Sequence, residues 1–251
     1  MSKFYNAPTA VLLFALLVFT SVVPSEALAQ RGGFYTGQNE NPDNTELLVA
    51  RWRFGHNGWF GGSGWAHNYP EADQNLSAFI AGSTAVDITD NSYRWVHLES
   101  EEIFDYPFAF ISEPGEMNLS EQEVENLREY IARGGFVVMD DFDGLQQLDN
   151  MRYQVNRAFP DRKWVPLEID HPIFRQHFEL ENLHGMDDYV SGGYVVYYAL
   201  FDEHGEISMV AGYNNDLMNF WEWYNQPGTP IVPSTDAFRL GVNYMIYALT
   251  H

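Results

Sequence analysis

The chain has 251 residues, and its 13 Lys and Arg residues against 35 Asp and Glu residues give a formal net charge of −22 at pH 7. A field of this sign repels nucleic acid and anionic membranes, so we expect neither as a partner. The chain contains no cysteine. Disulfides, a lipid-anchored N-terminal cysteine and a thiol nucleophile are therefore excluded.

Residues 1–29 have the three parts of a secretory signal peptide. A weakly basic start contains Lys3, residues 10–23 are apolar, and Ala27-Leu28-Ala29 forms a small-residue exit. The apolar run is shorter than the roughly 20 residues that a spanning helix needs. We expect cleavage before Gln30, a periplasmic or secreted protein, and no membrane insertion after cleavage. The alternative is an uncleaved anchor.

The residues after the signal peptide predict a short lead-in followed by one domain. Residues 30–44 are rich in Gly and Asn and lack periodicity, which indicates a flexible segment. Residues 45–251 alternate between strand-like and helix-like patterns, which is typical of an α/β fold with a parallel sheet and helices on its faces. The expected strands are 45–54, 94–99, 106–113, 136–139, 193–201 and 207–213, and the expected helices are 71–84, 121–133, 145–159 and 236–249.

Three aspartates follow the expected strand 136–139, namely Asp140, Asp141 and Asp143. In open α/β sheets the ligand crevice lies beyond the carboxyl ends of the strands. Successive strand residues point to opposite faces, so Asp140 and Asp141 should have different roles unless the strand has already turned. The polar side chains expected at this edge are Arg53, the loop from His56 to His67, Glu99, Glu113, Asp140 and Asp141.

Three interpretations of the aspartates remain open. One of them caps the following helix, because carboxylates accept the free N–H groups of a helix start. Alternatively, Arg53 forms an ion pair with Asp140 or Asp141. In the third interpretation a divalent ion or polar ligand lies between Asp141 and the His56–His67 loop, although the spacing does not match an EF-hand. The sequence favours the cap or the ion pair, and we predict no metal ligands from it.

The chain contains two further histidine patterns. His171 follows Asp170 in an extended segment and is a candidate base that acts together with Asp141. His177, Glu181 and His184 do not have the His-Glu-x-x-His spacing that places two imidazoles on one helical face. We therefore predict a catalytic pair of Asp141 and His171, if the protein is an enzyme, and no zinc site at the second pattern.

Aromatic residues gather in two segments of the chain. Trp65 and Tyr69 belong to the first, with Trp52, Trp59 and Phe60 nearby, and the second contains Trp221, Trp223 and Tyr224. Aromatic side chains are most often part of the core. On loops beside a polar edge they would instead provide stacking surfaces for a glycan. Ligand-binding candidates are thus Arg53, Trp65, Tyr69, Asp140 and Asp141.

The stretch "DYPFAFISEPGEMNLSEQEVENLREYIARGGFVVMDDF", the later "HPIF" and the terminal "LGVNYMIYALTH" resemble a bacterial family known as domain of unknown function 4159. The family's Arg-x-Arg pattern is present as Arg51 and Arg53, and its Asp-Tyr-Pro is present as Asn68-Tyr69-Pro70. The resemblance implies a doubly wound, flavodoxin-like fold similar to that of class I glutamine amidotransferases. Those enzymes carry their cysteine on the turn where this chain has Asp140 and Asp141, so cysteine-dependent glutaminase chemistry is excluded.

Two functions follow as hypotheses. The first is a non-catalytic module of the cell envelope that binds a small polar molecule, a glycan or another envelope protein. The second is a hydrolase acting on a carbohydrate or amide, with Asp141 as base or metal ligand and His171 as its partner. The sequence identifies no cofactor.

Overall fold

The computed structural model describes residues 46–56, 64–183 and 194–251. All of them belong to one compact unit. No helix in this described part is long and apolar enough to cross a membrane. The expected signal peptide and lead-in lie outside the described residues, as do Trp59, Phe60 and His184.

A seven-stranded sheet organises the fold, in the order β2-β1-β3-β4-β7-β6-β5. The first five strands in this order are mutually parallel, whereas β6 runs antiparallel to both of its neighbours, β7 and the edge strand β5. The predicted α/β class is confirmed, with an antiparallel edge that the sequence did not indicate. The strands are β1 (Val49–Arg53), β2 (Tyr93–His97), β3 (Phe108–Ser112), β4 (Phe136–Phe142), β5 (Trp164–Pro166), β6 (Val196–Phe201) and β7 (Ile207–Tyr213).

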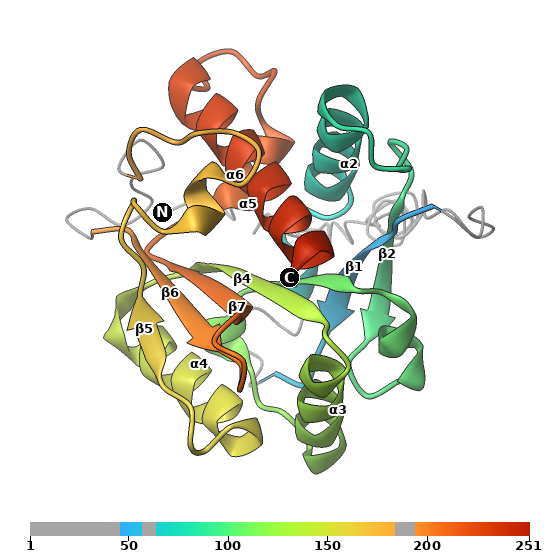
Figure 1. The fold of residues 1–251 in the computed structure, drawn as a ribbon, viewed down its shortest axis with the longest axis vertical. Helices are drawn as coiled ribbons and strands as arrows, with labels where there is room; N and C mark the ends of the chain where they lie inside the picture. The colour runs from blue at the N-terminus through green and yellow to red at the C-terminus, as the bar shows by residue number, and fades with distance from the viewer. Residues whose placement is uncertain (1–45, 57–63, 184–193) are drawn as a thin grey trace, which may run out of the picture. The chain divides into compact units, whose positions relative to one another are not determined.

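Helices cover both faces of the sheet, as expected for a doubly wound fold (Figure 1). One face carries α2, α5 and α6, and the other carries α3 and α4. The helices are α2 (Glu71–Ser83), α3 (Glu121–Ala132), α4 (Gly144–Ala158), α5 (Leu217–Glu222) and α6 (Ile231–Thr250), and short 3-10 turns include η2 (Gly64–Ala66), η3 (Glu101–Asp105), η4 (Pro114–Glu116) and η5 (Pro172–Arg175).

The strands divide their side chains between two cores. On β4, Val138 faces the core under α2, α5 and α6, whereas Val137 and Met139 face the core under α3 and α4. This alternation follows from the two-residue period of a strand, and burial on both faces explains the continuous apolar character of the central strands. The strand ends, rather than the faces, are therefore left for polar side chains.

Helix α3 begins where its sequence predicts. The Ser120 side chain accepts a hydrogen bond from the Glu123 backbone N–H at 3.1 Å, and the Glu123 carboxylate accepts one from the Ser120 N–H at 2.7 Å. This reciprocal capping box satisfies two backbone donors at the helix start. The Glu123 carboxylate also accepts the Gly55 N–H at 2.7 Å, which ties α3 to the segment after β1.

Strand β4 continues three residues beyond the predicted Met139 and ends at Phe142. Its pairing with β7 shifts between Met139 and Phe142, where three steps on β4 match two steps from Ala211 to Tyr213. The extra residue is a β-bulge, which bends a strand and redirects a side chain. Asp140 and Asp141 therefore lie at the bulge, where side chains stop alternating regularly between the two faces of the sheet.

Candidate functional site

Four polar side chains converge at the carboxyl end of β4. Asp141 lies on β4 itself, Glu113 directly follows the neighbouring strand β3, and Asp216 follows the other neighbour, β7. His67 follows the turn η2 and reaches the same place. The parallel directions of β3, β4 and β7 bring these residues together although they are far apart in sequence.

The backbone at this edge adopts several left-handed conformations. Asp141 has φ of 64° and Glu113 has φ of 54°, and the flanking Asn68 and Asn214 have φ of 60° and 55°. Non-glycine residues adopt this region at a cost, and such positions gather at functional sites when the surroundings hold them in place. Here the Asp141 N–H donates to the Asn215 carbonyl at 3.1 Å, which holds the bulge against the segment after β7.

The side chains of His67, Asp141 and Asp216 form a compact cluster. Each offers one metal-ligating atom, and these atoms all lie within 4.8 Å of one another. His67 Nδ1 and Asp141 Oδ2 are in direct hydrogen-bond contact. The Asp141 side chain is 15% exposed and that of His67 is 48% exposed, so the cluster can be reached from solvent. A ring nitrogen and two carboxylates are thus directed at one point.

Burial and mutual repulsion shift the protonation of this cluster. Burial, followed by the charge of Asp141, raises the pKa of Asp216 to about 8. The same two causes raise the pKa of Glu113 to about 8. The hydrogen bond to Asp141 raises the pKa of His67 to about 9, against the opposing effect of its burial. Asp216 and Glu113 thus retain their protons near neutral pH, and a cation bound in the cluster would favour their ionised forms.

Asp140 has a different role from Asp141. Its carboxyl is fully buried and accepts hydrogen bonds from the Leu217 N–H at the start of α5 and from Asn215 Nδ2, the latter at 3.3 Å. Burial raises its pKa well above the usual range, followed by the charges of Asp216 and Asp141. Asp140 therefore joins β4 to α5 beneath the surface of the protein. Because its carboxyl is fully buried, it is not placed to contact a ligand from solvent.

A buried ion pair positions the His67 segment. Arg51 Nη2 lies 2.6 Å from Asp73 Oδ2, and both side chains are only 1% exposed. Arg51 Nη1 also donates to the carbonyls of Trp65 and His67, at 3.3 and 3.0 Å. One guanidinium thus joins β1, α2 and the turn that carries His67, so Arg51 is a positioning residue for the cluster.

Residues 50–249 match the profile of the family described as Domain of unknown function (DUF4159). The chain belongs to this family. The match covers β1 to the last turn of α6, and therefore every residue of the cluster. A search of curated proteins found no match.

The two arginines of the family's Arg-x-Arg pattern have different surroundings. Arg53 is exposed, and its guanidinium lies 5.5 Å from the Trp65 ring centre and 5.9 Å from that of Trp95. Within the described residues it forms no ion pair with Asp140 or Asp141. The predicted Arg53 ion pair is therefore wrong, and the buried member of the pattern is Arg51.

The helix-cap interpretation applies only in part. Asp143 occupies the N-cap position of α4, but its side chain makes no capping hydrogen bond, and its N–H instead donates to Gln147 Oε1 at 2.7 Å. Asp141 contacts His67 and is not a cap. Of the three interpretations, the one that places Asp141 beside the His67 loop agrees best with the geometry.

His171 lies apart from Asp141 in the DUF4159 fold. It caps η5, where its ring nitrogen accepts the Ile173 N–H at 3.3 Å, and its ring centre lies 6.3 Å from that of Phe201. Phe201 pairs with Ile207, where β7 begins. This is the opposite edge of the sheet from Asp141, so the predicted pairing of Asp141 with His171 is corrected: the histidine at Asp141 is His67.

The aromatic candidates are mostly internal. Trp65 and Tyr69 are buried, each 2% exposed. They therefore do not form the exposed stacking surface that the glycan interpretation required. Trp221 is buried as well, whereas Trp223 and Tyr224 are 44% and 49% exposed. The described residues of the first aromatic segment therefore belong to the core, whereas the second segment offers two rings to solvent.

A second group of predicted residues lies at the ends of β1 and β2. Arg53, His56 and Glu99 line a hollow of about 580 Å³, together with His97, which was not predicted, and the start of α3. The predicted polar edge thus divides into this hollow and the His67 cluster.

Sequence reasoning missed Asp216. Asp216 follows the apolar strand β7, and Asp141 follows the apolar part of β4, so a polar run after apolar strand residues is the same signal in both cases. The signal is only usable when the direction of β7 is known, because an antiparallel strand would place Asp216 at the other edge.

Proposed function

We propose that the chain is an exported ligand-binding module of the bacterial cell envelope, and that it holds a divalent cation at His67, Asp141 and Asp216. The observation that carries the proposal is the convergence of three ligating atoms within 4.8 Å of one another. The export and the location rest on the signal-like residues 1–29.

The donor set favours some cations over others. One imidazole and two carboxylates suit Zn²⁺ or Mn²⁺ better than Ca²⁺, which takes six to eight oxygen ligands. Glu113 lies close enough for its pKa to respond to Asp141 and His67, and would add negative charge beside the ion. With three protein ligands, a tetrahedral ion keeps one position for a ligand from solvent.

A hydrolase is the second candidate, and one observation favours it. Asp141 has a left-handed backbone near the end of β4, shortly before α4, and amidotransferase-like folds present a nucleophile at a turn in this place. We infer that the fold is related to those enzymes. In this version Asp141 is a metal ligand or base and His67, rather than His171, is its partner. The module remains our first proposal, because the Asp141–His171 pair on which the hydrolase hypothesis depended does not form among the described residues.

Metal binding is tested by thermal unfolding of chelator-treated protein with Mg²⁺, Ca²⁺, Mn²⁺ or Zn²⁺. A metal at a hundred times its Kd adds about 2.7 kcal/mol to the free energy of unfolding. For a domain of this size we expect the Tm to rise by about 5–10 °C with Zn²⁺ or Mn²⁺. Asp141→Asn keeps the side-chain shape but removes the charge, and should abolish the rise.

Asp143→Asn is the matched control, because Asp143 is exposed two residues further along the chain and outside the cluster. It should retain the full metal response. The proposal fails if no metal raises the Tm of the wild type, or if Asp141→Asn responds as the wild type does.

Export gives a separate expected result. Expression of the full chain in a bacterial host should yield a secreted or periplasmic protein whose mature N-terminus is Gln30, as measured by intact-mass analysis. Replacing Ala27 and Ala29 by larger residues should block this cleavage, because the exit site requires small side chains. Recovery of the full-length chain in the membrane fraction would contradict the proposal.

A further inference from the structure

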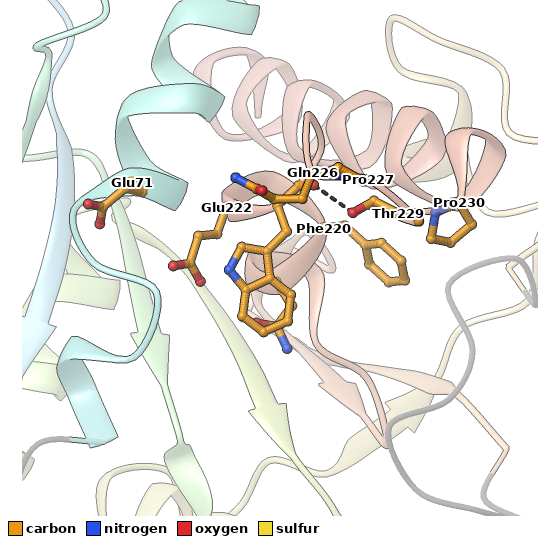
Figure 2. A pocket seen from close by; sticks show the side chains of 10 residues that line it. Glu71, Phe220, Glu222, Gln226, Pro227, Thr229 and Pro230 are labelled. Atoms are coloured by element: carbon orange, nitrogen blue, oxygen red, sulfur yellow. Dashed lines mark hydrogen bonds between the residues drawn. The ribbon is translucent and has the colours of Figure 1, made fainter.

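A hollow of about 650 Å³ lies beside the start of α2, the end of α5 and the loop that leads into α6. Figure 2 shows Glu71 and Glu222 on one side of it in this view, and Phe220, Thr229 and Pro230 on the other. Its volume is within the range of sites for small organic ligands. It is separate from the three residues of the metal cluster, none of which lines it.

The charge of the hollow is not compensated. Glu71 and Glu222 line it, and no basic side chain is among its described lining residues. In the part of the chain that the structure describes, neither carboxylate forms an ion pair. Glu222 accepts one hydrogen bond, from Asn68 Nδ2 at 2.6 Å. Two carboxylates without a cation would attract one, in a protein whose net charge of −22 adds to the attraction.

The hollow also presents an aromatic ring on a fixed backbone. Trp223 lines it and is 44% exposed. The Trp223 carbonyl accepts the Gln226 N–H at 2.9 Å and the Thr229 hydroxyl at 2.7 Å, which closes the loop around it. An exposed indole beside carboxylates is suited to an organic cation, because the ring face attracts positive charge and the carboxylates pair with it.

We propose that this hollow binds a ligand carrying a primary ammonium or guanidinium group. A neutral sugar would also stack on an indole, but it would leave both carboxylates without a counter-charge. A cation satisfies the ring and the carboxylates together. The site is independent of the metal proposal, since Asp141 is not part of it.

Isothermal titration calorimetry at low salt tests the proposal with three probes: agmatine, putrescine, and a blocked Gly-Arg-Gly peptide. We expect at least one to bind, and binding to weaken at least tenfold in 0.5 M NaCl because salt screens charge pairing. Binding of the small amines alone identifies a free ligand, whereas binding of the peptide identifies a side chain of a partner protein. Both results support the proposal.

Three variants test the site and two serve as controls. Trp223→Ala and Glu222→Gln should each weaken binding at least tenfold, and Glu71→Gln gives a second charge test that leaves the Asn68 hydrogen bond intact. Glu125→Gln, on the exposed side of α3, is the matched control and should bind as the wild type does. Asp141→Asn should also bind normally, which separates this proposal from the metal site.

Three results would overturn the proposal. The wild type could bind none of the three cations at millimolar concentration. Methyl glucoside or N-acetylglucosamine could bind at Trp223 without salt dependence, which would make the site a sugar site. Finally, the two charge variants could bind the cations as tightly as the wild type, which would place the cation elsewhere.

Discussion

Replacing Arg51 by methionine should lower the free energy of unfolding by about 3–5 kcal/mol, because the change leaves a buried carboxylate without its partner. Arg51 and Asp73 are 2.6 Å apart and their side chains are almost fully buried. Burial raises the pKa of Asp73, and the Arg51 guanidinium opposes this rise. Urea denaturation followed by circular dichroism measures the loss.

Two further variants separate the ion pair from a general loss of packing. Arg53→Met changes the exposed arginine two residues along the same strand, and should alter stability by less than about 0.5 kcal/mol. The double variant Arg51→Met/Asp73→Leu replaces both charges by apolar side chains, and should regain much of the lost stability. An Arg51→Met variant as stable as the wild type would contradict the assigned role of Arg51.

The same substitution should also affect the cluster. Arg51 holds the carbonyls of Trp65 and His67, so the stability-recovered double variant still lacks the hydrogen bonds that place the His67 segment. We expect it to bind metal more weakly than Arg53→Met does. Comparing the double variant with Arg53→Met thus separates the effect of Arg51 on metal binding from its effect on stability.

Secondary structure could be predicted from the sequence where it depends on local signals alone. The capping box of Ser120 and Glu123 predicts the start of α3, and Gly134 and Gly135 follow its end. The apolar run before Asp140 predicts β4. These features depend on neighbouring residues and on periodicity, which is why reading the chain in order was sufficient.

The site was only partly accessible, because it depends on contacts between distant segments. The sequence indicated Asp141 and the His67 loop but gave no reason to join Asp216 to them, since the direction of β7 follows from the hairpin it forms with β6. The bulge that redirects Asp141 arises from an extra residue in the pairing of β4 with β7. Pairing register is a tertiary property, and no pattern within β4 reports it.

The two arginines show a similar limit. Arg51 and Arg53 share one strand face, and alternation alone does not distinguish them. What distinguishes them is the neighbouring α2, which supplies Asp73 to Arg51, while Arg53 reaches the strand end and solvent. A charged side chain within a strand is usually placed at the surface by sequence reasoning, and a buried pair is missed for that reason.

The metal-free protein should lose stability as the pH rises from about 6 to 9. Burial raises the pKa of Asp216 and of Glu113 to about 8 each, so their folded forms retain protons that the unfolded chain has already released. Stability therefore falls as pH rises toward these values, by at most about 1.4 kcal/mol per pH unit for each group. His67 acts in the same direction: its raised pKa of about 9 gives stability that is complete below its unfolded value of 6.5 and is lost as pH rises through 9. Its contribution is smaller, because its side chain is 48% exposed and solvent screens it.

Asp216→Asn isolates the effect, since an amide oxygen can still accept the Asn219 N–H that Asp216 accepts at 2.9 Å. The variant should show a shallower loss of stability between pH 6 and 9, and should be more stable than the wild type at pH 9. Zn²⁺ or Mn²⁺ should reverse the wild-type trend, because metal ligands bind in their deprotonated forms and affinity rises with pH. Urea denaturation at pH 6, 7, 8 and 9, with and without metal, measures both slopes. Equal slopes in wild type and Asp216→Asn would show that Asp216 does not have the raised pKa from which this loss of stability is argued.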